Sequence, residues 1–422
     1  MNSASPQTET AAPRLDFETQ LDRLAQAAVH CGLGLAPGQE LVMTAGIEAL
    51  PLARRITEHA YRAGATLVTT FYGDEASALL RYQHGSDSSF DAAAGWLYEG
   101  MAAAYKNGAA RLAIAGGDPA LLAQQDPEKV SRANRANSRA YRPALELITR
   151  HDINWTIVAA ATPAWARAVF PELEPEAALA RLWAAIFAAS RVDGPDPVAA
   201  WKRHDAGLHA RADRLNARRF SSLHFRGPGT DLKVGLADDH VWLGGGMQAH
   251  NGRYCIPNIP TEEVFTTPHK NRVEGVVAST KPLSHMGTMI EEIAVRFEGG
   301  KIVEARAARG ESVLRRLLET DDGAARLGEV ALVPHSSPIS AGGRLFLNTL
   351  FDENAACHIA LGQAYATCVR GGDHLSQEEL AARGANESLI HVDWMIGSGR
   401  MDVDGITASG AAEPLLRQGE WV

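Results

Sequence analysis

The sequence predicts an α/β protein in which an amino-terminal, mainly parallel α/β domain precedes a mixed α/β domain. Three observations lead to this fold class. Strand and helix signals alternate in the first half, the composition shifts between residues 190 and 222, and β-rich runs dominate beyond that point. The 422 residues also exceed what one hydrophobic core usually organises, which favours two domains. We expect these domains to span residues 16–190 and 191–422.

The first half repeats a strand followed by helical sequence. Residues 50–63 have the apolar spacing of an amphipathic helix that ends before Gly64. Residues 179–189 are apolar but include Arg181 and fall short of the roughly 20 residues of a membrane span, so we expect a buried helix. Four short runs have the composition of strands: residues 40–44, 66–72, 111–115 and 155–160. Such alternation is typical of a parallel sheet flanked by helices.

A connector separates the two halves. Residues 193–197 (Asp-Gly-Pro-Asp-Pro) break the preceding helix, and residues 201–219 form a charged helical stretch. We expect His204 and His209 to lie on its solvated face. Beyond it, helical runs at residues 312–320 and 345–351 fall between strands. The β-rich runs are residues 224–226, 230–235, 272–278, 292–297, 300–304 and 328–334.

Composition excludes several classes of protein. The formal net charge of -9 shows no basic excess, which weighs against nucleic-acid binding. Four cysteines without a CxxC pair are too few for a disulfide framework and predict reduced thiols. Residues 1–14 lack the basic start and apolar core of a secretory signal, and no apolar run is long enough for a membrane span. We therefore expect a cytoplasmic protein without a membrane partner.

Acids and histidines interrupt the apolar runs of the second half. Residues 352–365 place Glu353, His358 and Tyr365 among small and apolar residues. Burying a carboxylate in such surroundings is costly unless a cation accompanies it, and a bound metal commonly brings carboxylate and imidazole together. Three further apolar runs are interrupted in the same way: residues 260–265, 327–333 and 390–398.

The candidate ligands are too numerous for a single ion. They comprise four carboxylates and two imidazoles, which a bridging carboxylate would spread over two divalent ions. On a strand, His391 and Asp393 face the same side, while Val392 and Trp394 face the other. The set is Glu263, Glu329, Glu353, His358, His391 and Asp393.

The neighbouring acids Glu262 and Glu263 follow the same rule of alternation. In an extended segment they point to opposite faces, so only one of them meets the metal. The other acid is left to orient a water, to act as a base or to face solvent.

Four motifs closely resemble the thermophilic-type aminopeptidases of metallopeptidase family M29, in order and in separation. They are residues 260–266 (Pro-Thr-Glu-Glu-Val-Phe-Thr), residues 328–333, residues 352–356 with 358–362, and residues 391–393 with 395–398. The resemblance is strongest over residues 243–398 and extends from about residue 16 to the end. It implies a cytoplasmic exopeptidase of two domains, usually a homodimer, with a two-metal site in the carboxy-terminal domain. Trp394 stands where the family leads us to expect Phe.

Carried over position by position, the resemblance places the family's metal ligands on all six candidates. The separation from Glu329 selects Glu263 rather than Glu262, and the active-site tyrosine falls on Tyr365. It implies two divalent ions, drawn from zinc, cobalt, manganese or magnesium, bridged by Glu329 and activating a water. The substrates would be peptides with a free amino terminus, and Tyr365 would donate a hydrogen bond to the oxyanion.

Two other classes compete with this interpretation. A mononuclear iron(II) ring-cleaving dioxygenase of pyridine catabolism would need only two histidines and one carboxylate, whereas this chain keeps six candidate ligands. A binding protein without catalytic activity would be expected to have lost at least one ligand. All six positions hold residues that can bind a metal.

Overall fold

The computed structural model describes residues 15–285 and 288–422. The first half is built on a parallel sheet, as the alternating pattern predicts, and its strand order is β2-β1-β3-β4. These strands are β1 (Glu40–Gly46), β2 (Leu67–Gly73), β3 (Ala110–Ala115) and β4 (Trp155–Ala159).

Helices cover both faces of this sheet. Alternate residues of β1 enter different cores: Leu41 and Met43 belong to the larger apolar cluster, and Val42 belongs to a smaller one on the opposite face. The larger cluster is packed by α1 (Phe17–Ala27), α2 (Leu50–Arg62), α6 (Pro163–Val169) and α7 (Pro175–Ala189). The smaller cluster is packed by α4 (Gly95–Lys106) and α5 (Pro127–Thr149). Helix α3 (Glu75–His84) follows β2 and contributes no buried residue.

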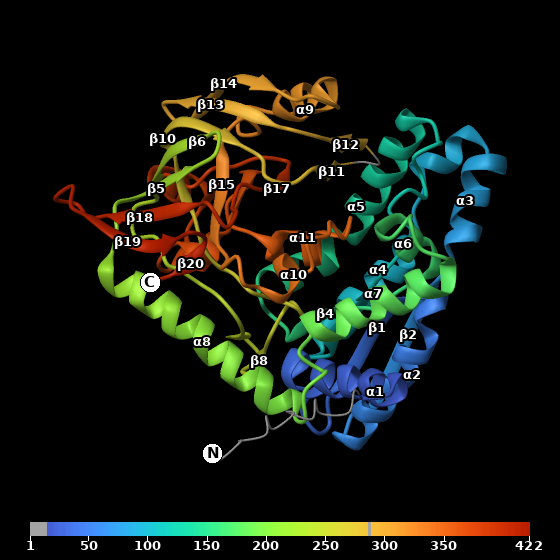
Figure 1. Cartoon of the computed structure of the whole chain (residues 1–422). Coiled ribbons are helices and arrows are strands. Elements are labelled where there is room, and N and C mark those ends of the chain that lie inside the picture. Colours follow the sequence, from blue (N-terminus) through green and yellow to red (C-terminus); the bar gives the residue numbers. More distant parts are fainter. Residues whose placement is uncertain (1–14, 286–287) are drawn as a thin grey trace, which may run out of the picture.

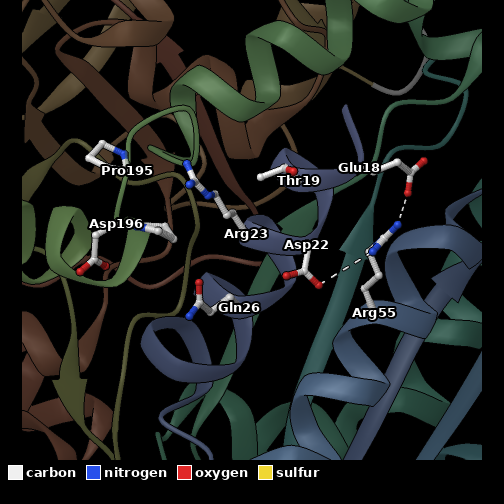
Figure 2. A pocket seen from close by; sticks show the side chains of 9 residues that line it. Glu18, Thr19, Asp22, Arg23, Gln26, Arg55, Pro195 and Asp196 are labelled. Atoms are coloured by element: carbon white, nitrogen blue, oxygen red, sulfur yellow. Dashed lines mark hydrogen bonds and ion pairs between the residues drawn. The ribbon is translucent and has the colours of Figure 1, made fainter. Parts of the chain in front are cut away.

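The connector is the long helix α8 (Pro197–Arg218), which runs from α1 to the strands at the carboxyl end of the chain (Figure 1). Its start lies beside a polar hollow of about 640 Å³ between α1, α2 and the turn at Pro195. Figure 2 shows Arg55 reaching from α2 toward Glu18 and Asp22 of α1 across this hollow. The ion pairs therefore fasten the two helices beside the connector.

Antiparallel sheets dominate the second half. An eight-stranded sheet has the order β14-β13-β10-β6-β5-β18-β19-β20. Its strands are β5 (Ser222–Gly227), β6 (Thr230–Leu236), β10 (Pro268–Ala278), β13 (Ala294–Glu298), β14 (Lys301–Arg306), β18 (Asp402–Ile406), β19 (Ala412–Arg417) and β20 (Glu420–Trp421). Helix α9 (Glu311–Leu318) buries Leu314 and Leu317 in the core beneath this sheet.

A second, four-stranded sheet carries the predicted motifs. Its order is β17-β16-β15-β9 and every neighbouring pair is antiparallel. The strands are β9 (Val264–Thr266), β15 (Leu327–Leu332), β16 (His358–Gly362) and β17 (His391–Met395). Two small hairpins, β7 (Met247–Gln248) with β8 (Tyr254–Cys255) and β11 (Leu283–His285) with β12 (Thr288–Ile290), complete the strands.

Two expectations for the second half were wrong in detail. Residues 345–351 do not form one helix, because Asn348 caps a short helix, α11 (Thr349–Asp352), by accepting a hydrogen bond from the backbone of Leu350. His204 is not solvated: its Nε2 lies 2.7 Å from the carbonyl oxygen of Thr261. The contact between α8 and the extended segment before β9 partly encloses the ring.

Segments of the second half also pack against the first. Ile259 and Phe351 are buried in the same core as β1 and β4. The backbone N–H of Ile157 in β4 donates to the carbonyl of Pro257 at 2.7 Å, and the N–H of Ile259 donates to the carbonyl of Ile157 at 3.0 Å. The chain that leads into Glu262 and Glu263 is therefore held to the edge of the parallel sheet.

None of the described helices combines the length and hydropathy needed to cross a bilayer. All four cysteines are buried and free of disulfides.

Candidate metal centre

The four-stranded sheet separates charged from apolar side chains. Its register places Glu329, Ala360 and Asp393 side by side across three strands, and pairs Gly362 with His391. Since side chains alternate along a strand, one face carries Glu329, His358, His391 and Asp393. The opposite face carries Val330, Ile359, Leu361 and Trp394, all buried in the core of the second half. The backbone pattern thus gathers the charged groups of three motifs on one surface.

Glu263 joins this face from the extended segment that precedes β9. Its Oε2 lies 3.0 Å from Nε2 of His358, which in turn is 3.4 Å from Oε1 of Glu329. The second oxygen of Glu329, Oε2, lies 3.7 Å from Nε2 of His391, and this nitrogen is 3.5 Å from Oδ1 of Asp393. Five of the six candidate ligands therefore form one continuous group.

These five residues make two possible ion sites that share one carboxylate. Glu263, Glu329 and His358 offer ligand atoms within 4.8 Å of one another, and so do Glu329, His391 and Asp393. The two oxygens of Glu329 face different histidines. With an ion in each group, Glu329 would be placed to bridge the two.

Both histidines are oriented by backbone carbonyls. Nδ1 of His358 lies 3.1 Å from the carbonyl oxygen of Ala356, and Nδ1 of His391 lies 2.7 Å from that of Gln363. A carbonyl oxygen only accepts, so each Nδ1 carries the proton. Each Nε2 faces carboxylate oxygens, and loss of its proton would leave a lone pair there for a cation between them.

The electrostatics of the metal-free group also favour a cation. Burial and the neighbouring acids Asp393 and Glu263 raise the pKa of Glu329 to about 7. Burial opposes charge on His391, but the contact with Asp393 and the negative charges of Asp393 and Glu329 together outweigh burial and raise the pKa of the imidazole to about 9. Oε2 of Glu263 and Oδ1 of Asp393 are buried and, apart from the histidine Nε2 atoms that face them, have no hydrogen-bond partner among the described residues. The donor set, rich in carboxylate oxygen with two imidazoles, fits divalent metal ions.

Glu353 stands slightly apart from the other candidates. It lies in the 3-10 turn η4 (Glu353–Ala355) and lines the same cavity, but belongs to neither group of three. Burial and the negative charges of Glu263 and Asp393 raise its pKa well above the ordinary value. It therefore shares the electrostatic environment of the cluster.

Tyr365 forms part of the cavity wall. Its ring centroid lies 4.8 Å from that of His391 and 6.2 Å from that of Phe265. Burial and the carboxylates of Glu329 and Asp393 raise the pKa of its hydroxyl well above the usual range. The hydroxyl thus stays protonated and can donate a hydrogen bond into the cavity.

Glu262 points away from the cluster, as the alternation of an extended segment predicts. Its carboxylate forms an ion pair with Arg191, with N to O distances of 2.6 and 2.8 Å, and lies 3.6 Å from Nε2 of His204. Arg191 itself lies over the ring of Trp201, 5.4 Å from its centroid. Glu262 is therefore an anchor of the segment that carries Glu263.

Sequence reasoning missed the residues that hold these segments together. Asn354 is fully buried; its Oδ1 accepts from the backbone N–H of Glu262 at 2.7 Å, and its Nδ2 donates to the carbonyl of Leu350 at 3.0 Å. The only sequence feature that pointed to Asn354 was its amide side chain, which stands beside Glu353 among apolar residues. At Gly328, a β-carbon would come within 2.2 Å of the carbonyl oxygen of Gln363, so glycine permits the close approach of the two segments beside the site.

A cavity of about 330 Å³ opens onto the charged face. Tyr365 and five of the candidate ligands line it: Glu263, Glu329, Glu353, His391 and Asp393. Further lining residues come from α5 and the turn after it, from β3 and β4, and from β7: Arg111, Tyr141, Leu145, Ile148, His151, Trp155, Ile157 and Met247. Residues of the parallel sheet and of the four-stranded sheet therefore share one cavity.

Known proteins resemble this chain both in sequence and in fold. The family model described as thermophilic metalloprotease (M29) matches residues 17–421. Aminopeptidase T of Thermus thermophilus is 56% identical over 406 residues, covering 96% of this chain and 99% of the relative. The structure of wild-type AmpT from Thermus thermophilus superimposes with a TM-score of 0.92 at 55% identity, over 96% of this chain and all of that one.

The fold of 2,5-dihydroxypyridine dioxygenase from Pseudomonas putida KT2440 is a distant likeness. It reaches a TM-score of 0.49 at 12% identity, with 96% of each chain covered, which carries no argument about activity. A family match over nearly the whole length and a relative above half identity decide the assignment. The chain belongs to the M29 family of thermophilic metalloproteases.

Proposed function

We infer that this metal-dependent aminopeptidase releases amino-terminal residues from peptides at a centre of two divalent ions. The observation that carries the inference is the pair of three-residue groups sharing Glu329, each with its own histidine. Glu263, Glu329 and His358 would hold one ion, and Glu329, His391 and Asp393 the other. Glu353, which lines the same cavity, would complete the set. Zinc, cobalt, manganese and magnesium all suit such ligands.

The residues of the chain have distinct parts in this proposal. Bound divalent ions would supply Lewis acidity that polarises the peptide carbonyl and makes a water molecule more acidic. The carbonyls of Ala356 and Gln363 keep the two imidazoles in the tautomer that binds a cation. Tyr365, held protonated by its raised pKa, would donate a hydrogen bond to the carbonyl oxygen as negative charge develops there.

The cavity explains why a free amino terminus would be required. Its acidic side is rich in carboxylates, which favour an amine group over the continuation of a peptide chain. We further propose that residues 16–190 and 191–422 are the two domains and that the protein works as a cytoplasmic homodimer, as the family resemblance implies. Light scattering coupled to size exclusion would test the dimer, which a monomeric mass would contradict.

The activity is tested by hydrolysis of leucine amide before and after chelation. We expect the chelated protein to lose activity and to regain it with added zinc, cobalt, manganese or magnesium. The proposal fails if leucine amide is not hydrolysed and the protein instead takes up oxygen with a dihydroxypyridine, with one iron per chain.

A further inference from the structure

The cavity has a cationic side that the metal chemistry does not use. Arg111, near the start of β3, is half-buried and lines the same cavity as the carboxylates. Its guanidinium lies 5.6 Å from the centroid of the Trp155 ring, which fixes the side chain by a cation-π contact. Among the described residues it has no carboxylate within ion-pair distance and no hydrogen-bond acceptor for its side chain. The guanidinium carries five N–H donors. Because it is partly enclosed and no described protein group accepts from these donors, it can bind an anionic group.

Two neighbouring nitrogen atoms share this lack of partners. Nε1 of Trp155, which can only donate, and Nδ1 of His151 are enclosed without a hydrogen-bond partner in the described part of the chain. The rings of His151 and Trp155 stack with centroids 5.8 Å apart and an interplanar angle of 22°. Arg111, Trp155 and His151 therefore form a layered group of side chains with nitrogen atoms that lack a partner among the described residues, here called the donor wall after its guanidinium and indole N–H groups.

The donor wall and the metal ligands lie at one cavity and carry opposite charge. Glu263, Glu329, Glu353 and Asp393 line it from the second half of the chain, and Arg111 lines it from the first half. The lining also includes the apolar side chains of Leu145, Ile148 and Ile157. A short peptide has the complementary layout: an amino group at one end, apolar side chains between, and a carboxylate at the other end.

We propose that Arg111 binds the free terminal carboxylate of a short peptide substrate and so selects peptides that end within the cavity. This specificity rests on the proposed aminopeptidase activity and names its substrate class. The charge-assisted hydrogen bonds from the guanidinium oppose the repulsion that the acidic side of the cavity exerts on a carboxylate. Arg111 touches the substrate away from the scissile bond and takes no part in the chemical step.

The test compares free and amidated peptides. Wild-type protein and the Arg111→Met variant, which keeps an unbranched apolar side chain over Trp155, are assayed with Leu-Gly, Leu-Gly-Gly and Leu-Gly-Gly-Gly and with the carboxamide of each. We expect the wild type to prefer the free acid at one of these lengths by about ten- to a hundredfold in kcat/KM. The Arg111→Met variant should lose this preference while its rates on the carboxamides stay the same.

Arg62→Met is the matched control. Arg62 lies on α2, its side chain is 67% exposed and it does not line the cavity. This variant removes the same charge and should keep the preference of the wild type. If Arg111→Met slowed acids and amides equally, the residue would be structural and the proposal would be wrong.

Two further outcomes separate the possible failures. Hydrolysis of leucine amide without any preference for free acids would overturn the role of Arg111 and leave the aminopeptidase intact. A second outcome is a preference for leucyl-glutamate amide over leucyl-glutamine amide that depends on Arg111, with no preference for terminal carboxylates. It would show that the donor wall binds acidic side chains and would contradict the proposal. No hydrolysis of any substrate would refute both proposals together.

Discussion

Two adjacent glutamates, Glu262 and Glu263, are both buried, yet their surroundings differ in one decisive way. Glu262, 3% exposed, is neutralised inside the chain by the ion pair with Arg191. Glu263, 9% exposed, faces a histidine and further acids. A buried carboxylate requires a compensating cation in either case. The first acid has its cation in Arg191, whereas the second shares two histidines with three other acids, and we propose that bound metal completes its compensation.

The same contrast holds for the clusters around the two acids, here called the anchor cluster and the ligand cluster. The anchor cluster contains Glu262, Arg191 and His204. The ligand cluster contains the six candidate metal ligands, with four carboxylates to two histidines. A closed ion pair stabilises the fold, whereas an uncompensated excess of acids destabilises the metal-free protein and creates affinity for metal. Of the two neighbouring acids, Glu262 thus contributes to stability and Glu263 to the proposed function. The following experiments separate these two contributions.

Glu329→Gln should give the largest effect. The substitution removes the carboxylate common to both groups of ligands, so activity should fall by about a thousandfold or more. The metal-free variant should be no less stable than the metal-free wild type, because one of several repelling acids is gone. Steady-state assays and thermal melts in chelator would show both. A variant that keeps its activity would remove Glu329 from its bridging role.

Arg191→Met should damage the anchor cluster instead. It leaves Glu262 buried without its cation, a loss of about 3 to 5 kcal/mol in the free energy of unfolding. The control is Arg344→Met, which breaks an exposed pair with Glu172 and should cost about 0 to 1 kcal/mol. Denaturant unfolding in the presence of a chelator measures the loss of free energy of unfolding in each variant. Equal, small losses would mean that the contrast between the clusters is wrong.

Tyr365→Phe should act on the reaction and leave both clusters' charges unchanged. Loss of a hydrogen bond to the developing oxyanion should lower kcat by about a hundredfold or more. Metal content should stay at the wild-type level, because the phenol is not among the candidate ligands. Unaltered kcat would show that the hydroxyl is not used.

The smallest effect, taken per pH unit, is the pH dependence of metal affinity. In the metal-free protein the pKa of Glu329 is raised to about 7 and that of His391 to about 9, so both hold protons that a metal must displace. Affinity should therefore rise with pH between about 6 and 9, by about tenfold for each proton displaced per pH unit. Competition titrations with a chelating dye would measure this slope. Glu329→Gln should have a shallower slope, and an affinity that is flat with pH would contradict the raised pKa values.

Much of the fold could be predicted from local sequence. Strands β1 to β4 alternate with helices, and this order was confirmed by the all-parallel sheet. Alternation along a strand also placed His391 and Asp393 on one face and Trp394 in the core, because that rule is purely local.

Contacts between distant segments could not be predicted. Arg191 and Glu262 are separated by 71 residues, and no local pattern links them. His204 looked like part of a solvated helical face because helical spacing alone does not show what packs on it. The donor wall likewise depends on β3 and β4 facing the ligand cluster across one cavity, which is a property of the tertiary structure. The ligand types were readable from the sequence, but the partners that position them were not.

The most direct test is the metal content of gently purified protein, measured by mass spectrometry beside the Glu329→Gln variant. The proposed two-ion centre predicts about two divalent ions per wild-type chain and a clear reduction in the variant. About one ion per chain, unchanged by the substitution, would contradict the central claim that the acid excess is neutralised by two ions sharing Glu329.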